Sequence, residues 1–84
     1  MKKLLKFEAE WCSQCKALAP TLTKVMEEFP DVELVKVDCE VDEQETLKYG
    51  IRSMPTLIYL KDNVEIGRLV GAVPADKIRE LLNK

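Results

Sequence analysis

The chain has 84 residues, of which 46% are hydrophobic and 33% are charged, as in ordinary globular proteins. Its formal net charge of −2 and the lack of a basic cluster argue against nucleic acid as a partner. No apolar run approaches the ~20 residues of a membrane helix, and the start MKKLLKFEAEW is too soon broken by charge for a signal peptide, so we expect a cytoplasmic protein without membrane contact.

Four strands are predicted along the chain. The first is LLKFEA at residues 4–9, and the second is VELVKV at residues 32–37. The third and fourth are TLIYL at 56–60 and VEIGRLV at 64–70. The turn-forming cluster KDN separates these last two strands, so we expect them to form a β-hairpin.

Three helices are predicted between and after these strands. The first carries one apolar stripe, is kinked by Pro20 and ends at Pro30. Its stripe consists of Leu18, Leu22, Val25, Met26 and Phe29. A shorter helix is expected over Glu43–Tyr49, closed by Gly50. The last helix follows Pro74 and buries apolar residues on one face, namely Ile78, Leu81 and Leu82.

The resulting order of elements is βαβαββα. Two strands joined through a long helix pair in parallel with a right-handed crossover, whereas the hairpin adds two antiparallel strands. We therefore expect a single α/β domain over residues 1–84, with a four-stranded mixed sheet flanked by helices on both faces.

Two cysteines in WCSQCK, Cys12 and Cys15, could form a metal clamp, a structural staple or a reversible redox pair. The chain has three cysteines and no histidine, so it lacks imidazole ligands and cannot complete a four-thiolate zinc site alone. Cys12 follows a predicted strand and opens a helix, where free N–H groups and the helix dipole lower a thiol pKa from ~8.5 toward neutrality. This position favours an exposed, activated Cys12 beside a shielded Cys15, whereas Cys39 is expected to be a passive thiol.

Several motifs along the chain together resemble the thioredoxin family. They are WCSQCK at 11–16, Pro20, KVD at 36–38, YGIRSMPTLIYLKD at 49–62 and VGA at 70–72. The resemblance covers almost the whole chain and implies the thioredoxin fold. Because the sequence starts at the strand that leads to CxxC, it is similar to the shortened thioredoxins that lack a preceding strand and helix, a core also shared with glutaredoxins.

The resemblance implies a role for each residue of the site. Cys12 would attack the substrate disulfide and Cys15 would resolve the mixed disulfide. Met54 and a cis Pro55 would face the cysteines, and the backbone of Met54 would pair with an extended substrate segment. The remaining substrate-contacting residues would be Trp11, Ser13, Gln14 and Gly71. Ser13 and Gln14 replace the usual Gly-Pro, a dipeptide that tunes the redox poise in the family.

The sequence departs from the family pattern at KFE, residues 6–8. Lys6 stands where thioredoxins bury an aspartate, and Glu8 stands where an aromatic residue is usual. Side chains two apart on a strand share a face, so Lys6 and Glu8 lie together. We hypothesise that Glu8 accepts the proton of Cys15 and that Lys6 keeps Glu8 ionised. The alternative is that both side chains reach solvent past the first helix.

The most consistent interpretation is a small, monomeric thiol–disulfide oxidoreductase that reduces protein disulfides. It would receive electrons from a thioredoxin reductase-type donor and would need no bound cofactor or metal. One alternative is a glutaredoxin-like, glutathione-dependent reductase. Another is a module that binds a metal or an iron–sulfur cluster between two chains through Cys12 and Cys15.

Overall fold

A computed structural model describes all residues, 1–84, and has the predicted order βαβαββα. The elements are β1 (Lys2–Glu8), α1 (Ser13–Met26), β2 (Val32–Asp38), α2 (Glu43–Lys48), β3 (Thr56–Lys61), β4 (Val64–Val70) and α3 (Ala75–Leu82). None of the three helices has the length and apolar character needed to cross a membrane.

The four strands form one mixed sheet in the order β2-β1-β3-β4, which places β1 and β3 at its centre. The two N-terminal strands, β1 and β2, are parallel, with Lys6 opposite Lys36 and Glu8 opposite Asp38. Strand β3 runs antiparallel to both β1 and β4. The hairpin turn between β3 and β4 uses Asp62 and Asn63 at positive φ (51° and 68°), as the turn-forming sequence predicts.

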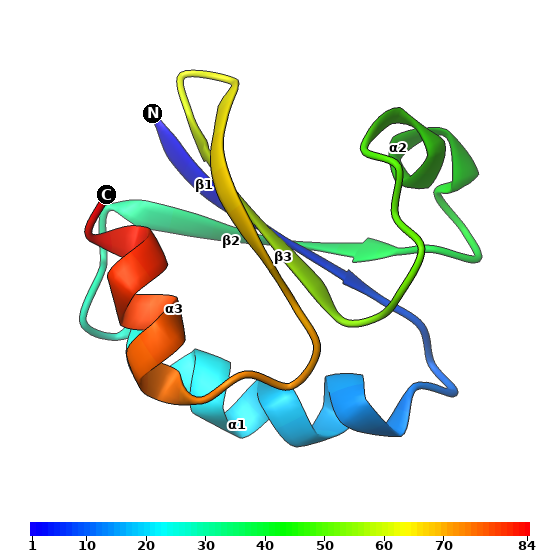
Figure 1. Cartoon of the computed structure of the whole chain (residues 1–84), viewed down its shortest axis with the longest axis horizontal. Coiled ribbons are helices and arrows are strands. Elements are labelled where there is room, and N and C mark those ends of the chain that lie inside the picture. The colour runs from blue at the N-terminus through cyan, green and yellow to red at the C-terminus, as the bar shows by residue number, and fades with distance from the viewer.

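Helices cover both faces of the sheet, as expected (Figure 1). Helices α1 and α3 lie together on one face, over a core that includes Leu4, Leu57 and Tyr59. Helix α2 lies on the other face, where Phe7 and Ile58 are buried. Alternate residues of β1 and β3 therefore belong to different cores, because successive side chains of a strand point to opposite faces.

The first helix is shorter than predicted. It ends at Met26, whereas the apolar stripe had placed Phe29 inside it. Glu28 and Phe29 donate their backbone N–H groups to carbonyls three residues earlier, at Val25 and Met26. Such tight turns end a helix when a proline follows, because the residue before proline disfavours helical geometry. Phe29 still packs against the core from this turn.

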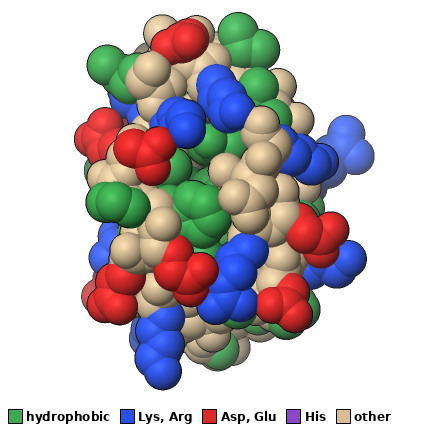
Figure 2. All heavy atoms as spheres, turned by 90° about the vertical axis from the view of Figure 1, so that its left-hand side faces the viewer, with side chains coloured by type: hydrophobic (Ala, Val, Ile, Leu, Met, Phe, Trp, Pro, Cys, Tyr) green, Lys and Arg blue, Asp and Glu red, His purple; other side chains and the backbone are tan.

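Several ion pairs lie at the end of the molecule that carries the two termini. Figure 2 shows acidic and basic side chains interspersed on this face, without a large area of one sign. Lys2 pairs with Asp31 across 2.9 Å, and its hydrogen bond lowers the pKa of the Asp31 carboxyl. Arg79 of α3 donates to Glu28, just beyond α1, and lowers the pKa of that carboxyl. Such exposed pairs orient the elements and add little stability.

Tyr59 is the largest fully buried side chain of the core. Its hydroxyl is buried and has no hydrogen-bond partner among the protein groups. A buried polar group without a partner loses the hydration that it has in the unfolded chain. The Tyr59 hydroxyl therefore destabilises the folded state relative to the unfolded chain.

Replacing Tyr59 with phenylalanine should raise the free energy of unfolding by about 1 kcal/mol, because the ring stays and the unpaired hydroxyl is removed. Urea unfolding of the parent protein and Tyr59→Phe measures this difference. Leu57→Ala, on the same strand and face, serves as the control and should lower the free energy of unfolding by about 2–5 kcal/mol. A loss of stability in Tyr59→Phe would show that the hydroxyl is satisfied in solution.

Candidate active site

Cys12 occupies the N-cap position of α1, directly after the short loop that follows β1. Its backbone is extended (φ −82°, ψ 106°), and its amide donates to the carbonyl of Ala9 at 3.1 Å. The Cys12 sulfur accepts a hydrogen bond from the backbone N–H of Cys15 at 3.1 Å. The sulfur therefore fills the place that a Ser or Asp oxygen takes in an ordinary N-cap.

The two cysteines form a disulfide, Cys12–Cys15, with their Cα atoms 5.3 Å apart. Both side chains are buried, with exposed fractions of 6% for Cys12 and 2% for Cys15. The prediction that Cys12 is exposed is therefore wrong for this oxidised state, although Cys12 remains the more accessible of the two. The reason is local packing, because the two cysteines form a small apolar cluster with Ala9, against which Met54 packs.

The loop before β3 brings a second group of residues to the disulfide. The peptide bond between Met54 and Pro55 is cis, as the family resemblance predicts. The Pro55 carbonyl accepts the amide hydrogen of Gly71 at 2.8 Å, which ties this loop to the end of β4. Gly71 has a φ of +92°, a conformation that favours glycine. The cysteines, Met54, Pro55 and Gly71 are thus gathered at one end of the sheet.

Three further predicted substrate-contacting residues lie at the surface beside the cysteines. Trp11 immediately precedes Cys12, and 66% of its side chain is exposed. Ser13 and Gln14 form the first turn of α1 between the cysteines and are also exposed. No packing partner accounts for the large apolar surface of Trp11, which stays available for a partner molecule.

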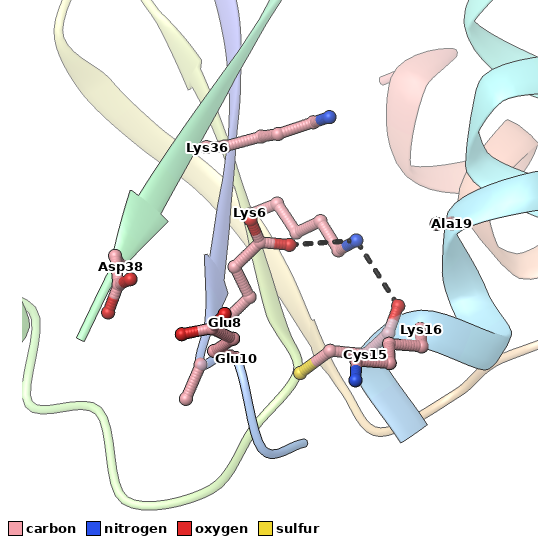
Figure 3. A pocket seen from close by; sticks show the side chains of 9 residues that line it. Lys6, Glu8, Glu10, Cys15, Lys16, Ala19, Lys36 and Asp38 are labelled. Carbon is pink, nitrogen blue, oxygen red and sulfur yellow. Dashed lines mark hydrogen bonds and ion pairs between the residues drawn. The ribbon is translucent and has the colours of Figure 1, made fainter. Parts of the chain in front are cut away.

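Behind Cys15, side chains of β1, α1 and β2 line a hollow of about 310 Å³ that is open to solvent on one side (Figure 3). Only 2% of Lys6 is exposed, and its ammonium lies 3.2 Å from the Cys15 carbonyl oxygen. The same ammonium lies 3.0 Å from Oε1 of Glu8, whose side chain is 27% exposed. The alternative that both side chains reach solvent is therefore wrong, because Lys6 ends beneath α1.

Sequence reasoning did not identify the rest of the hollow. Its other charged side chains are Glu10, Lys16, Lys36 and Asp38. Lys36 and Asp38 stand opposite Lys6 and Glu8 in the parallel pairing of β1 with β2. The available signal was the matched alternation of charged residues in KFE and KVD, which predicts one shared face once the two strands are paired in register.

Cys39 lies apart from the redox pair. Its amide donates to the Glu8 carbonyl at 2.9 Å, and its side chain packs with the Phe7 and Val37 core on the α2 face. No group of three or more Cys, Asp or Glu side chains has an arrangement that could hold a metal ion. Cys12 and Cys15 form the one disulfide of the chain, and Cys39 is its one free cysteine.

Comparisons with known proteins agree with this site. The sequence model of the thioredoxin family matches residues 1–84. The chain is 40% identical to a thioredoxin of Chlamydia trachomatis over 81 residues, covering 96% of this chain and 79% of that protein. It is 39% identical to a thioredoxin of Bacillus subtilis over 82 residues, with the same two coverages.

Solved structures give the same result. The crystal structure of Fasciola hepatica thioredoxin superposes with a TM-score of 0.89 at 35% identity, covering 98% of this chain and 78% of that one. Mitochondrial thioredoxin 3 of Saccharomyces cerevisiae, in its oxidised form, gives a TM-score of 0.90 at 32% identity, with coverages of 99% and 78%. With the disulfide at the start of α1, these matches show that the chain belongs to the thioredoxin family and is a thiol–disulfide oxidoreductase with the redox-active pair Cys12 and Cys15.

Proposed function

We propose that this protein reduces disulfides in protein substrates and is itself reduced by a thioredoxin reductase-type donor. The observation that carries this proposal is the Cys12–Cys15 disulfide at the N-terminus of α1, beside an exposed aromatic side chain and an unpaired backbone segment. A dithiol that donates electrons must be regenerated in a reducing compartment, so we place the protein in the cytoplasm.

The reaction begins with the reduced dithiol. The Cys12 thiolate attacks one sulfur of the substrate disulfide, forms a mixed disulfide and expels the other substrate sulfur as a thiolate. The Cys15 thiol then loses its proton, and its thiolate attacks the Cys12 sulfur. The Cys12–Cys15 bond forms as the bond to the substrate breaks. Two electrons pass to the substrate, which leaves with two thiols, and the protein is left with the disulfide seen here.

The start of α1 favours Cys12 as the attacking group. The backbone N–H of Cys15 points at the Cys12 sulfur, and the positive end of the helix dipole lies at the same place. Both interactions stabilise a thiolate more than a thiol, whereas Cys15 lies one turn further into the helix. Cys15 is the more deeply buried of the two and is the resolving thiol.

Substrate binding is proposed to use the loop that faces the disulfide. Neither backbone polar group of Met54 has a hydrogen-bond partner within the chain. A free N–H and a free carbonyl on one residue can pair with an extended peptide, as in β-augmentation. The surface around this segment carries the other proposed contacts, which are Trp11, Ser13, Gln14 and Gly71, whereas the Pro55 side chain is buried and is proposed to shape the loop from within.

Insulin reduction tests the proposed function. Turbidity should develop when the protein is combined with insulin and a thioredoxin reductase system, because separated insulin chains precipitate. The parallel reaction uses glutathione and its reductase as the electron source. Turnover with glutathione alone would assign the protein to glutathione-dependent reductases and would contradict the proposal.

The two cysteines should differ in reactivity. In the reduced protein at neutral pH, iodoacetamide should label Cys12 about tenfold faster than Cys15, because only Cys12 lies at the activating helix start. Peptide mass spectrometry after timed quenching measures both rates. Cys15→Ser should accumulate a stable mixed disulfide with substrate, whereas Cys12→Ser should accumulate none. Equal labelling rates would overturn this assignment of roles.

Gly71 should contribute to the binding of protein substrates, in addition to allowing the positive φ at this position. Gly71→Ala and Gly50→Ala should each lower the free energy of unfolding by about 1 kcal/mol, because both glycines have positive φ and neither added methyl group meets a neighbour. Only Gly71→Ala should slow insulin reduction, by about tenfold, which corresponds to about 1.4 kcal/mol of lost substrate binding.

Gly50→Ala is the matched control, since Gly50 follows α2 and has no proposed contact with substrate. Reduction of a small aromatic disulfide should be equally fast in both variants and in the parent. Equal insulin rates in the two variants would remove Gly71 from the substrate-binding surface.

A further inference from the structure

A positive charge is buried directly behind the redox pair. Lys6 is a lysine in the middle of β1, and its side chain runs beneath α1 to the backbone of Cys15. Lysine is rarely buried unless it is paired, because removing an ammonium group from water is costly. An apolar residue of similar length would fill this place at no such cost. Packing alone therefore does not account for a lysine at this position.

Glu8 is the acidic partner of this buried charge. Of the three carboxylates that line the hollow behind Cys15, only that of Glu8 forms an ion pair with Lys6. Figure 3 shows the Glu8 carboxylate directed at the Lys6 ammonium, with the Cys15 sulfur on the other side of the hollow. Glu8 is partly exposed whereas Lys6 and Cys15 are buried, so of these three groups only the Glu8 carboxylate can exchange a proton with bulk water directly.

The titratable and charged groups around this carboxylate come from three elements. Strand β1 and the loop after it contribute Lys6 and Glu10, α1 contributes Cys15 and Lys16, and β2 contributes Lys36 and Asp38. Lys16, Lys36, Glu10 and Asp38 form no ion pair with either member of the Lys6–Glu8 pair. The pair therefore acts as a unit, with the other charges at the rim of the hollow.

We propose that the Lys6–Glu8 ion pair takes up the proton of Cys15, so that one negative charge beside Lys6 moves from the Glu8 carboxylate to the Cys15 sulfur. This inference rests on the proposed function and deepens its second step. In the mixed disulfide, the Cys15 thiol gives its proton to the Glu8 carboxylate through a water molecule in the hollow. Glu8 becomes a neutral acid, Cys15 becomes a thiolate, and the Lys6 ammonium remains as the partner of the new anion.

This exchange keeps the net charge of the site constant. A proton lost directly to bulk water would leave an additional negative charge in the buried region, whereas transfer to Glu8 only moves the negative charge from one side of Lys6 to the other. The Cys15 thiolate then attacks the Cys12 sulfur and expels the substrate thiolate. Glu8 releases its proton to solvent through the open side of the hollow, and the ion pair with Lys6 forms again.

Lys6 is a positioning residue in this scheme. Its ammonium has three N–H donors: it donates a hydrogen bond to the Cys15 carbonyl oxygen and forms an ion pair with the Glu8 carboxylate. These two contacts hold Glu8 near Cys15 and anchor the start of α1 to β1. The remaining donor can follow the negative charge as it moves.

Stopped-flow mixing with a nitroaryl disulfide separates the two chemical steps, because each step releases one coloured thiolate. Cys39→Ser serves as the background, so that only the redox pair reacts. Glu8→Gln should leave the first phase unchanged and slow the second phase by about tenfold at neutral pH, the low end for the loss of a proton acceptor. Above the pH at which Cys15 ionises unaided, the difference should vanish.

Two further variants complete the test. Lys6→Met should shift the rise of the second phase with pH to more alkaline values, because the thiolate loses its cationic partner. Glu10→Gln, which removes a carboxylate of the same hollow without touching Lys6, is the matched control and should behave as the parent. Equal second-phase rates in Glu8→Gln and the parent, or equal slowing in Glu8→Gln and Glu10→Gln, would overturn the inference.

The failure of this inference can be told apart from the failure of the proposed function. If the parent protein gives no fast first phase, Cys12 does not attack disulfides and the proposed function itself fails. If the first phase is normal and the rate of the second phase is the same in Glu8→Gln as in the parent, only the role of the ion pair is rejected. Circular dichroism of each variant confirms that the compared proteins are folded.

Discussion

Strand β1 is hydrogen-bonded along both of its edges, to β2 in parallel and to β3 in antiparallel register. Its two faces are also covered, by α1 and α3 on one side and, on the other, by a core against which Tyr49 and Ile51 pack just after α2. A strand enclosed in this way cannot shift by one residue without moving its apolar side chains to the wrong core. The end of β1, and with it the loop that carries Cys12, is therefore held in a fixed place.

The active-site segments depend on this fixed strand in different ways. Helix α1 follows β1 after a short loop, and Lys6 links the two elements by donating to the Cys15 carbonyl oxygen. The loop with Met54 leads into β3, the antiparallel neighbour of β1. Gly71 follows β4 and is bonded to the Pro55 carbonyl. The disulfide thus lies where segments distant in the sequence converge at one end of the sheet.

The order of elements, the parallel pair β1–β2, the hairpin β3–β4 and the redox pair could be predicted from the sequence, whereas the antiparallel pairing of β1 with β3 could not, because no connection in the chain dictates it. Periodicity marks the strands and helices, and the alternation along β1 separates Lys6 and Glu8 from Phe7. The end of α1 was placed too late because the apolar stripe includes Phe29, which packs against the core from a turn. Periodicity reports burial, which does not require a residue to be helical.

The details of the site depended on packing that no local pattern contains. Whether the Lys6 side chain reaches solvent is decided by the width of the α1 layer above it, and the structure buries it. Cys12 is covered in part by Met54, a residue from a distant loop. The hollow behind Cys15 needs the register of β1 against β2, which only the folded sheet fixes.

The placement of Cys39 has a consequence for the fidelity of thiol exchange. Cys39 belongs to the α2 face of the sheet, whereas Cys15 lies on the α1 face beside Lys6. A third thiol in the same compartment would compete with Cys15 for the mixed disulfide. Here the paired strands β1 and β2 separate the two sulfurs. A protein of this small size can thus contain a third cysteine and still form a single intramolecular disulfide.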